Sequence, residues 1–223
     1  MFASYVNTRD LIEIISADAY SPDILEVIKM LTDCSKLGTY LKGKPRLGIT
    51  GTIENEYVDK TSDGAVPYIT TKQTKDIIVY PTDCKYISKK ADNLWKKCRV
   101  FDGQIIINKS GNVGMASMLR TYDYKYVNSV SDIININIHE DKIDPYFLVL
   151  YLNSVYGQKQ LQRLGGGAVF DHISIFAIPD IKIKNVDMSI QVAISNKIRK
   201  AEIQKRIADT LFNKASKIGR AHV

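Results

Sequence analysis

Three polar side chains in a glycine-rich stretch could contact the phosphates and bases of a nucleic acid. Lys109, Ser110 and Asn112 lie between glycines and follow three consecutive isoleucines, residues 105–107. The isoleucines predict a short buried strand, and glycine lets a backbone approach another molecule closely. A cation, a hydroxyl and an amide suit phosphate oxygens and base edges. Taken alone, this loop fits an ordinary polar hairpin better, because it has no fixed phosphate-binding spacing.

Similar side chains recur in three other loops, at residues 72–75, 120–125 and 163–172. Each loop follows a segment with the apolar pattern of a strand or helix, and Tyr or Phe is often close by. Lysine and arginine neutralise phosphates, whereas amides and guanidinium groups read base edges. We therefore predict that Lys72, Gln73 and Arg120 contact duplex DNA together with the central loop. A set of solvated loops is the alternative interpretation.

Catalytic motifs are weak in this sequence. Three acid-x-Lys triplets, at 83–85, 123–125 and 180–182, match half of a metal-dependent nuclease site, but no Pro-Asp pair precedes them at a suitable distance. Residues 144–146 faintly resemble the adenine methyltransferase signature, although a helix start explains them better. There is no serine nucleophile elbow, P-loop or dinucleotide fingerprint. The sequence therefore favours binding over catalysis and predicts no catalytic residue, metal or cofactor.

The composition is that of a globular protein with a basic excess. The chain has 223 residues, enough for one domain and an appendage, and its net charge is +7. A basic excess favours polyanionic partners. Because the sequence shows no signal peptide and no apolar run of membrane-spanning length, we expect no membrane partner. Three cysteines without metal-ligand spacing predict reduced thiols in the cytoplasm.

The segments around the loops predict alternating helices and strands. Ser21 and Pro22 begin a helix, and Asp144 and Pro145 begin another that continues as far as Leu161. Strands are expected where β-branched residues cluster, and residues 132–138 alternate in the manner of a half-buried strand. The other expected strands are residues 66–71, 105–107, 176–179 and 181–183.

One long helix is predicted at the end of the sequence, because residues 187–217 contain neither glycine nor proline. Its apolar residues form two rows, and a helix with two apolar faces requires two neighbours. The first row resembles an imperfect coiled-coil seam, which favours a partner helix over packing on the chain's own domain. The residues predicted to contact a partner helix are Ile194, Ile198, Ala201, Ala208 and Phe212. The second row comprises Val192, Ala193, Ile203, Ile207 and Leu211.

The order of these features resembles the target-recognition domain of specificity subunits in type I restriction–modification systems. Closely similar domains are fused to methyltransferases in some single-chain restriction enzymes. Residues 64–69 resemble the family's Gly-x-Ile-Pro-Trp-Ile strand, and residues 103–114 resemble its glycine-rich hairpin. Residues 184–191 depart from the usual Pro-Pro-Leu-x-Glu-Gln, which leaves the branch of the family open. The other resembling segments are residues 16–22, 36–38, 146–161, 165–173 and 178–207.

This resemblance implies that the chain recognises one half of a split target in double-stranded DNA and performs no chemistry. It also implies that the long helix pairs antiparallel with another such helix and docks methyltransferase (modification) subunits, and that a restriction subunit joins through the complex. The second recognition domain would lie in the same chain or in a homodimer. The alternatives are the recognition domain of a fused methyltransferase–restriction enzyme and a free-standing Mg²⁺-dependent endonuclease.

The sequence as a whole predicts an α+β fold in three parts. Residues 1–186 form a DNA target-recognition domain with a mixed, twisted sheet and packed helices. Residues 187–217 form the long helix for helix pairing and methyltransferase docking. Residues 218–223 resemble the translation of a sequencing-library adapter, which predicts that the natural chain continues differently.

Overall fold

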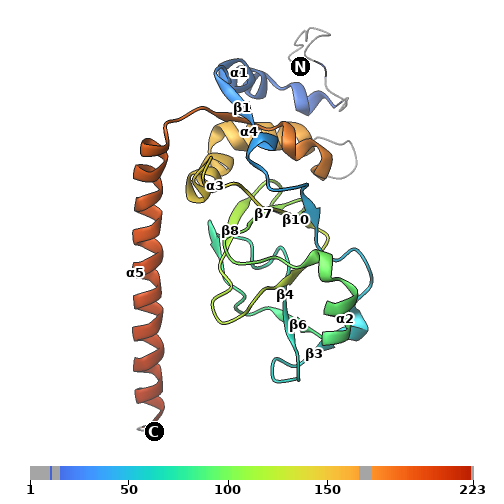
Figure 1. Cartoon of the computed structure of the whole chain (residues 1–223), viewed down its shortest axis with the longest axis vertical. Coiled ribbons are helices and arrows are strands. Elements are labelled where there is room, and N and C mark those ends of the chain that lie inside the picture. Colours follow the sequence, from blue (N-terminus) through green and yellow to red (C-terminus); the bar gives the residue numbers. More distant parts are fainter. Residues whose placement is uncertain (1–10, 12–15, 166–171, 222–223) are drawn as a thin grey trace.

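A five-stranded sheet lies at the centre of the computed structural model, which describes residue 11 and residues 16–165 and 172–221 (Figure 1). The strand order is β2-β10-β7-β8-β5, and all neighbours are antiparallel except β5 and β8. The glycine-rich loop connects the antiparallel neighbours β7 and β8, as the hairpin pattern predicts. The strands are β2 Arg46–Leu47, β5 Ile78–Val79, β7 Ile105–Asn108, β8 Ala116–Leu119 and β10 Ile133–Ile136.

A four-stranded sheet and one helix form the lower part of the domain in Figure 1. The strand order is β3-β6-β4-β9, with β4 and β9 parallel and the other pairs antiparallel. Ser88 begins the helix, since its hydroxyl accepts a hydrogen bond from Ala91 N at 3.1 Å. The elements are β3 Tyr57–Val58, β4 Val66–Ile69, β6 Lys85–Ile87, α2 Lys89–Leu94 and β9 Asn128–Ser129.

Three helices and a small two-stranded sheet cover the other end of the domain. The strands β1 and β11 join segments that lie far apart in the sequence, and α4 packs against α1 and α3. These elements are α1 Pro22–Met30, β1 Cys34–Lys36, α3 Pro145–Asn153, α4 Val155–Gly165 and β11 Lys182–Lys184. Five short 3-10 helices complete the described domain, at Ala17–Tyr20, Leu37–Tyr40, Glu54–Glu56, Lys96–Cys98 and Ile175–Asp180.

The isoleucine-rich strands supply the core. Ile105 and Ile107 of β7 face α3 in the largest apolar cluster, whereas Ile106 faces a second cluster on the other side of the sheet. All three are fully buried, which confirms the prediction of a buried strand. A strand covered on both faces has no solvent side, so its sequence reads as a continuous apolar run.

Three details of the sequence-based prediction are wrong. The expected single helix from Pro145 to Leu161 is two helices, because the chain breaks at Ser154, which has extended backbone angles. Residues 176–179 form part of a 3-10 helix rather than an edge strand. Strand β10 is buried along its whole length, not half-buried, since both of its edges and both of its faces are covered.

The last element, α5 Met188–Ala221, confirms the predicted long helix and extends it by four residues. Its 34 residues span about 51 Å. Figure 1 shows it standing beside the domain, with its first turns near α3. Residues 166–171 and 222–223, which fall within the predicted turn and tail, lie outside the described residues.

Truncation of the core residue Leu148 should destabilise the domain strongly. Leu148 is fully buried in α3, so Leu148→Ala removes apolar contacts and leaves a cavity, at a cost of about 2–5 kcal/mol in the free energy of unfolding. The matched control is Leu94→Ala, because Leu94 is 77% exposed and the change should stay within about 0.5 kcal/mol. Urea denaturation measures both. Equal effects would contradict this description of the core.

Candidate nucleic-acid interface and helix junction

The two loops that carry Lys72 and Lys109 lie side by side at one end of the five-stranded sheet. Thr74 Oγ1 donates a hydrogen bond to Asn108 Oδ1 at 2.6 Å, and Asn108 Nδ2 donates one to Thr74 O at 3.3 Å. Both residues are fully buried, so these bonds hold the turn and the glycine-rich loop together. The structure thus brings together two segments that the sequence separates by more than thirty residues.

The glycine-rich loop has a fixed backbone. Lys109 N donates to Asp132 O at 2.7 Å, and Lys109 O accepts from Ile173 N at 3.2 Å. Gly114 has a φ of +82°, and a Cβ there would lie 3.1 Å from the Cβ of Leu161. Glycine is needed at this position because a side chain would meet both an unfavourable backbone conformation and helix α4. The loop can therefore present its side chains from a rigid support.

The predicted contact residues differ in what their side chains do. The Lys72, Lys109 and Asn112 side chains form no ion pair or hydrogen bond within the described part of the chain, and Lys109 is half-buried whereas the other two are exposed. Ser110 donates its hydroxyl proton to Asp132 Oδ1. Gln73 Oε1 accepts from Thr70 N at 2.9 Å, while Gln73 Nε2 donates to Asp83 O at 3.0 Å. Ser110 and Gln73 therefore shape the loops that carry the other three.

Arg120 lies at the opposite end of the sheet from Lys109, because it follows the last residue of β8. Four strand residues separate these ends by about 13 Å. Arg120 Nε donates to Glu202 Oε1 at 3.2 Å, and Nη1 donates to Asp102 Oδ2 at 3.1 Å. Nη2 donates to the hydroxyl of Tyr146. In this structure Arg120 joins the domain to α5.

A buried carboxylate, Asp144, forms the centre of the junction between domain and helix. Its Oδ1 accepts hydrogen bonds from Tyr146 N at 2.9 Å and from Phe147 N at 3.2 Å, and so begins α3. The same oxygen accepts a bond from Ser195 Oγ at 2.6 Å, while Oδ2 accepts from Arg199 Nη2 at 2.5 Å. One side chain therefore caps one helix and holds another.

The pKa of Asp144 reflects these contacts. Burial raises the pKa, but the hydrogen bonds from Ser195 and Arg199 outweigh burial and hold the pKa of Asp144 below its usual value. Burial acts in the same direction on the neighbouring phenol, where it is not outweighed: burial and the Glu202 carboxylate together raise the pKa of Tyr146. The junction therefore keeps Asp144 ionised and Tyr146 neutral at neutral pH.

Sequence reasoning missed this junction because the contacting face of α5 is polar. Gln191, Ser195, Arg199 and Glu202 recur at helical spacing and point to the domain, with Gln191 and Ser195 at least nine-tenths buried. Gln191 Oε1 accepts from Asp144 N at 2.9 Å. A search for apolar rows finds none of these residues. The signal available in the sequence was a row of polar residues at steps of four, four and three, which keeps them on one face of a helix.

The apolar rows of α5 have different surroundings. Of the residues predicted to contact a partner helix, Ile198 packs on the domain core, whereas Ile194 and Phe212 are 38% and 73% exposed. Ala201 and Ala208 are also exposed. The second row is open to solvent as well: the exposed fractions of Ile203, Ile207 and Leu211 are 56%, 55% and 60%. Beyond its first four turns, the helix thus offers apolar surface on two sides.

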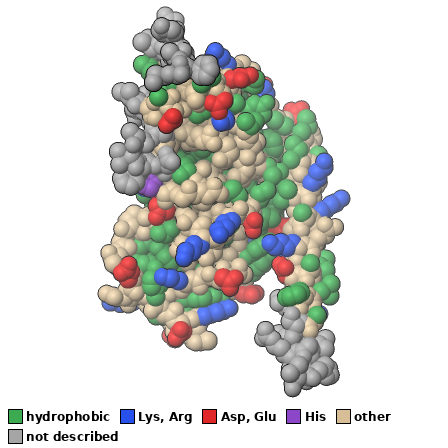
Figure 2. Space-filling view, turned by 180° about the vertical axis from the view of Figure 1, so that it is seen from behind, with side chains coloured by type: hydrophobic (Ala, Val, Ile, Leu, Met, Phe, Trp, Pro, Cys, Tyr) green, Lys and Arg blue, Asp and Glu red, His purple; other side chains and the backbone are tan. Residues whose placement is uncertain are grey.

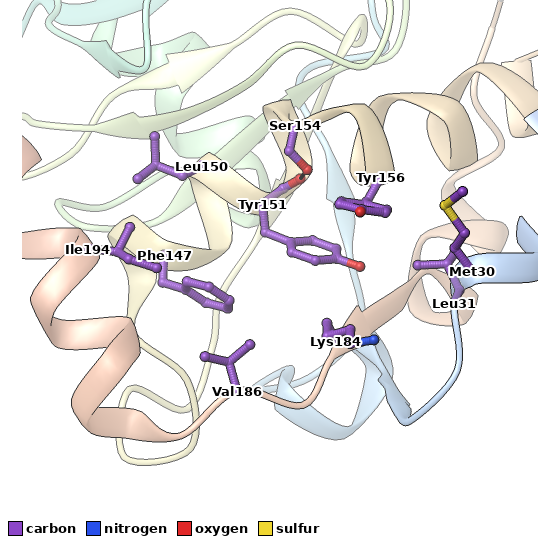
Figure 3. A pocket seen from close by; sticks show the side chains of 10 residues that line it. All are labelled: Met30, Leu31, Phe147, Leu150, Tyr151, Ser154, Tyr156, Lys184, Val186 and Ile194. Carbon is purple, nitrogen blue, oxygen red and sulfur yellow. Dashed lines mark hydrogen bonds between the residues drawn. The ribbon is translucent and has the colours of Figure 1, made fainter. Parts of the chain in front are cut away.

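An apolar cavity of about 440 Å³ lies where α1, α3 and the start of α5 meet. Figure 3 shows the rings of Phe147 and Tyr151 and the side chain of Val186 around it, with Met30 at one end and Ile194 at the other. Its walls are mainly aliphatic and aromatic. The cavity therefore offers apolar contacts and few polar ones.

Basic side chains are spread over the other half of the domain. Figure 2 shows Lys and Arg side chains across its lower part, interspersed with acidic ones. In the ranges that the structure describes, no group of three or more His, Cys, Asp or Glu side chains is placed to hold a metal ion. Over the same described ranges, no helix has both the length and the apolar character needed to cross a bilayer.

An α+β domain with grouped polar loops and a long, firmly attached helix defines a binding scaffold. The family described as the type I restriction modification DNA specificity domain matches residues 49–218. This match covers most of the sequence, so the chain belongs to that family and is a DNA specificity domain of the type I restriction–modification class. No curated protein matches the sequence.

Several solved structures share the fold at low sequence identity. The HsdS subunit from Thermoanaerobacter tengcongensis is 14% identical, with a TM-score of 0.52, and the match covers 86% of this chain and 45% of that one. The type I S subunit from M. genitalium is 13% identical, with a TM-score of 0.53, and the match covers 79% of this chain and 40% of that one. The type IIG restriction endonuclease BpuSI is 12% identical, with a TM-score of 0.61, and the match covers 83% of this chain and 28% of that one. The chain thus spans less than half the length of these proteins, and the likeness confirms the α+β fold.

Replacement of Asp144 by Asn should change how stability depends on pH. Because the folded-state pKa lies below the unfolded-state value of about 3.9, the carboxylate stabilises the fold fully above that value and stops doing so as pH falls through the folded-state pKa. Asn keeps the helix cap but loses charge-assisted bonds worth about 1.5–3 kcal/mol. Urea unfolding at neutral pH should therefore show Asp144→Asn to be less stable than the wild type, and the difference should shrink in acid.

The matched control is Asp63→Asn, because Asp63 is exposed and its side chain forms no ion pair or hydrogen bond with the residues that the structure describes. That variant should match the wild type within about 0.5 kcal/mol at every pH. A constant difference between Asp144→Asn and the wild type from neutral to acidic pH would contradict the assigned role of the carboxylate.

Proposed function

We propose that this chain binds one half of a split target in double-stranded DNA and thereby directs a type I methyltransferase and nuclease to it. The family assignment supports sequence recognition as the task of the domain. One observation supports the location of the DNA-binding surface: the Thr74–Asn108 hydrogen bonds join two loops at one end of the sheet. That end carries an exposed amide and two cations that pair with no residue in the described ranges, and such groups bind phosphates and read bases.

Within this surface, Lys72 and Lys109 bind phosphates of the DNA backbone, and Asn112 forms hydrogen bonds with a base edge. An asparagine amide has one donor and one acceptor side, which suits the major-groove edge of adenine. Gln73 and Ser110 act by positioning these loops, since their polar atoms already bind Asp83 and Asp132. Arg120 acts at the helix junction. The chain itself performs no chemistry and needs no cofactor.

The exposed part of α5 binds the other components of the system. We assign the row Ile203, Ile207 and Leu211 to a second helix of the same kind, in the same chain or in a second copy. These residues follow a four-residue spacing and line a groove of about 280 Å³ together with Arg206 and Thr210. The remaining surface of the helix docks methyltransferase subunits, and a restriction subunit joins through the assembled complex.

The test of the proposed function is selection from a randomised duplex DNA library, with and without a methyltransferase subunit, over a series of salt concentrations. Enrichment of one short motif, sharpened by the methyltransferase subunit, is the expected result. Binding without any motif, together with a steep salt dependence, would show only that a basic protein adheres to DNA and would contradict the proposal.

Replacement of Lys109 by Ala should weaken binding to every duplex and reduce the salt dependence. Loss of one phosphate contact lowers the slope of log affinity against log salt by about 0.9. The matched control is Lys142→Ala, because Lys142 is exposed and lies beyond the far end of β10. Fluorescence anisotropy measures both variants. If Lys109→Ala keeps the wild-type affinity and slope, the glycine-rich loop does not contact the DNA.

Replacement of Ile207 by Asp should prevent helix pairing, because a charge in an apolar seam loses its hydration without gaining a partner. Analytical ultracentrifugation of the wild type should show a dimer, and Ile207→Asp should be monomeric. Phe212→Asp is the control for the first apolar row and should remain dimeric. If Phe212→Asp is monomeric and Ile207→Asp is dimeric, the first row forms the seam. If the wild type is monomeric, pairing between copies is wrong.

A further inference from the structure

A second basic pocket lies at the opposite end of β4 from the Lys72 turn. It has a volume of about 310 Å³ and lies between the start of β4, helix α2 and the segment that leads to β9. Its charged lining residues are Lys89, Asp92, Arg99 and Lys125, so three cations and one carboxylate leave a net charge of +2. Neither the family assignment nor the loop surface described above accounts for this excess.

Arg99 is held rigidly at the inner wall of the pocket. Asp92, only 2% exposed, accepts bonds from Arg99 Nε at 2.9 Å and from its Nη2. Tyr126 and Asn128 also donate to this carboxylate, at 3.0 and 2.8 Å. The guanidinium carbon lies 4.2 Å from the centre of the Tyr126 ring. A guanidinium fixed in this way has little orientation left to lose when it binds an anion.

Arg99 also keeps donors for such an anion. Its Nε and Nη2 bind Asp92, but its Nη1 forms no hydrogen bond to any residue that the structure describes. Because Asp92 accepts four hydrogen bonds in all, its own acceptor capacity is filled. The carboxylate therefore orients the arginine, and its charge is already counted in the net charge of +2 that the pocket presents to an anion.

The two lysines of the pocket are uncompensated. Lys89 and Lys125 are exposed and form no ion pair with other residues in the described ranges. The stem of Lys89 lies over Gly64, where a Cβ would come within 2.9 Å of Lys89 Cδ. The next residue, Lys90, turns the other way and pairs with Glu56 at 3.3 Å. Two neighbouring lysines thus differ in surroundings, and only one serves the pocket.

We propose that this pocket binds a backbone phosphate of duplex DNA, as a second anchor beside the Lys72–Lys109 surface. The proposal rests on the proposed function, since it assumes the same duplex. A tetrahedral oxyanion can accept from Arg99 Nη1 and from both ammonium groups at once. The four residues of β4 separate the two surfaces by about 13 Å, which is about four steps of 3.4 Å along one strand of a duplex. This separation matches the spacing at which two phosphates of one duplex could be bound.

The test compares the double variant Lys89→Gln/Lys125→Gln with Lys90→Gln in the full chain. Both lysines are exposed, so the double variant should fold as the wild type does, and circular dichroism checks this. Binding to a short duplex is measured over a salt series. The double variant should lower the slope of log affinity against log salt by about 0.9 and weaken binding to all sequences alike, while the motif enriched from a library stays the same. Lys90→Gln should match the wild type.

Each result separates the two proposals. A wild-type slope in the double variant, with a motif still enriched, overturns the pocket and leaves the proposed function standing. A reduced slope without any enriched motif supports the pocket and contradicts the proposed function. No binding of the wild type to any duplex overturns both. Inorganic phosphate gives the last comparison: if it binds the wild type but not the double variant, and the DNA slopes are equal, the pocket serves a free anion and the proposal is wrong.

Discussion

Asp144 holds two helices to each other through one buried carboxylate. The side chain caps α3 and accepts bonds from Ser195 and Arg199 of α5. Removing such a charge from water is costly unless its hydrogen bonds are filled, and here both oxygens are used. The helix can therefore take up only the few orientations that preserve these bonds. Arg120 and Glu202 extend the same contact toward the five-stranded sheet.

This arrangement places the loop surface and the helix junction at two separate ends of the domain. The two loops that carry Lys72 and Lys109 lie at one end of the five-stranded sheet, where Thr74 and Asn108 join them. The helix junction lies at the other end of the sheet, where strands β8 and β10 end. The sheet between them, covered by apolar clusters on both faces, fixes the distance from these loops to the helix junction.

The sequence predicted the apolar part of this structure well. Short β-branched runs such as residues 105–107, and helix starts such as Ser21-Pro22 and Asp144-Pro145, depend on local physics, and the structure confirms them. The break at Ser154 was not predictable in the same way, because residues 145–161 keep helical spacing across it. The junction was missed for a related reason: Gln191 and Ser195 are buried by tertiary hydrogen bonds, which no hydropathy pattern reports.

In the candidate site, too, the local features could be predicted from the sequence and the tertiary contacts could not. Composition and loop chemistry singled out Lys72, Lys109 and Arg120 alike, because all three are cations in polar loops. Only the strand pairing shows that Lys109 and Arg120 lie at opposite ends of the sheet, and only the side-chain contacts show that Arg120 is already bound by Glu202 and Asp102. Pairing register and long-range ion pairs depend on contacts between distant residues, so a single sequence does not contain them in readable form.

The rigid attachment of α5 is tested most directly by amide hydrogen exchange along the helix. If the Asp144 and Arg120 contacts hold the helix, amides from Val192 to Glu202 should exchange slowly and at rates similar to those of α3. Amides beyond Leu211 should exchange faster in the unpaired chain, because terminal helix turns without tertiary contacts open locally. Uniform fast exchange along the whole helix, with α3 still protected, would contradict the account.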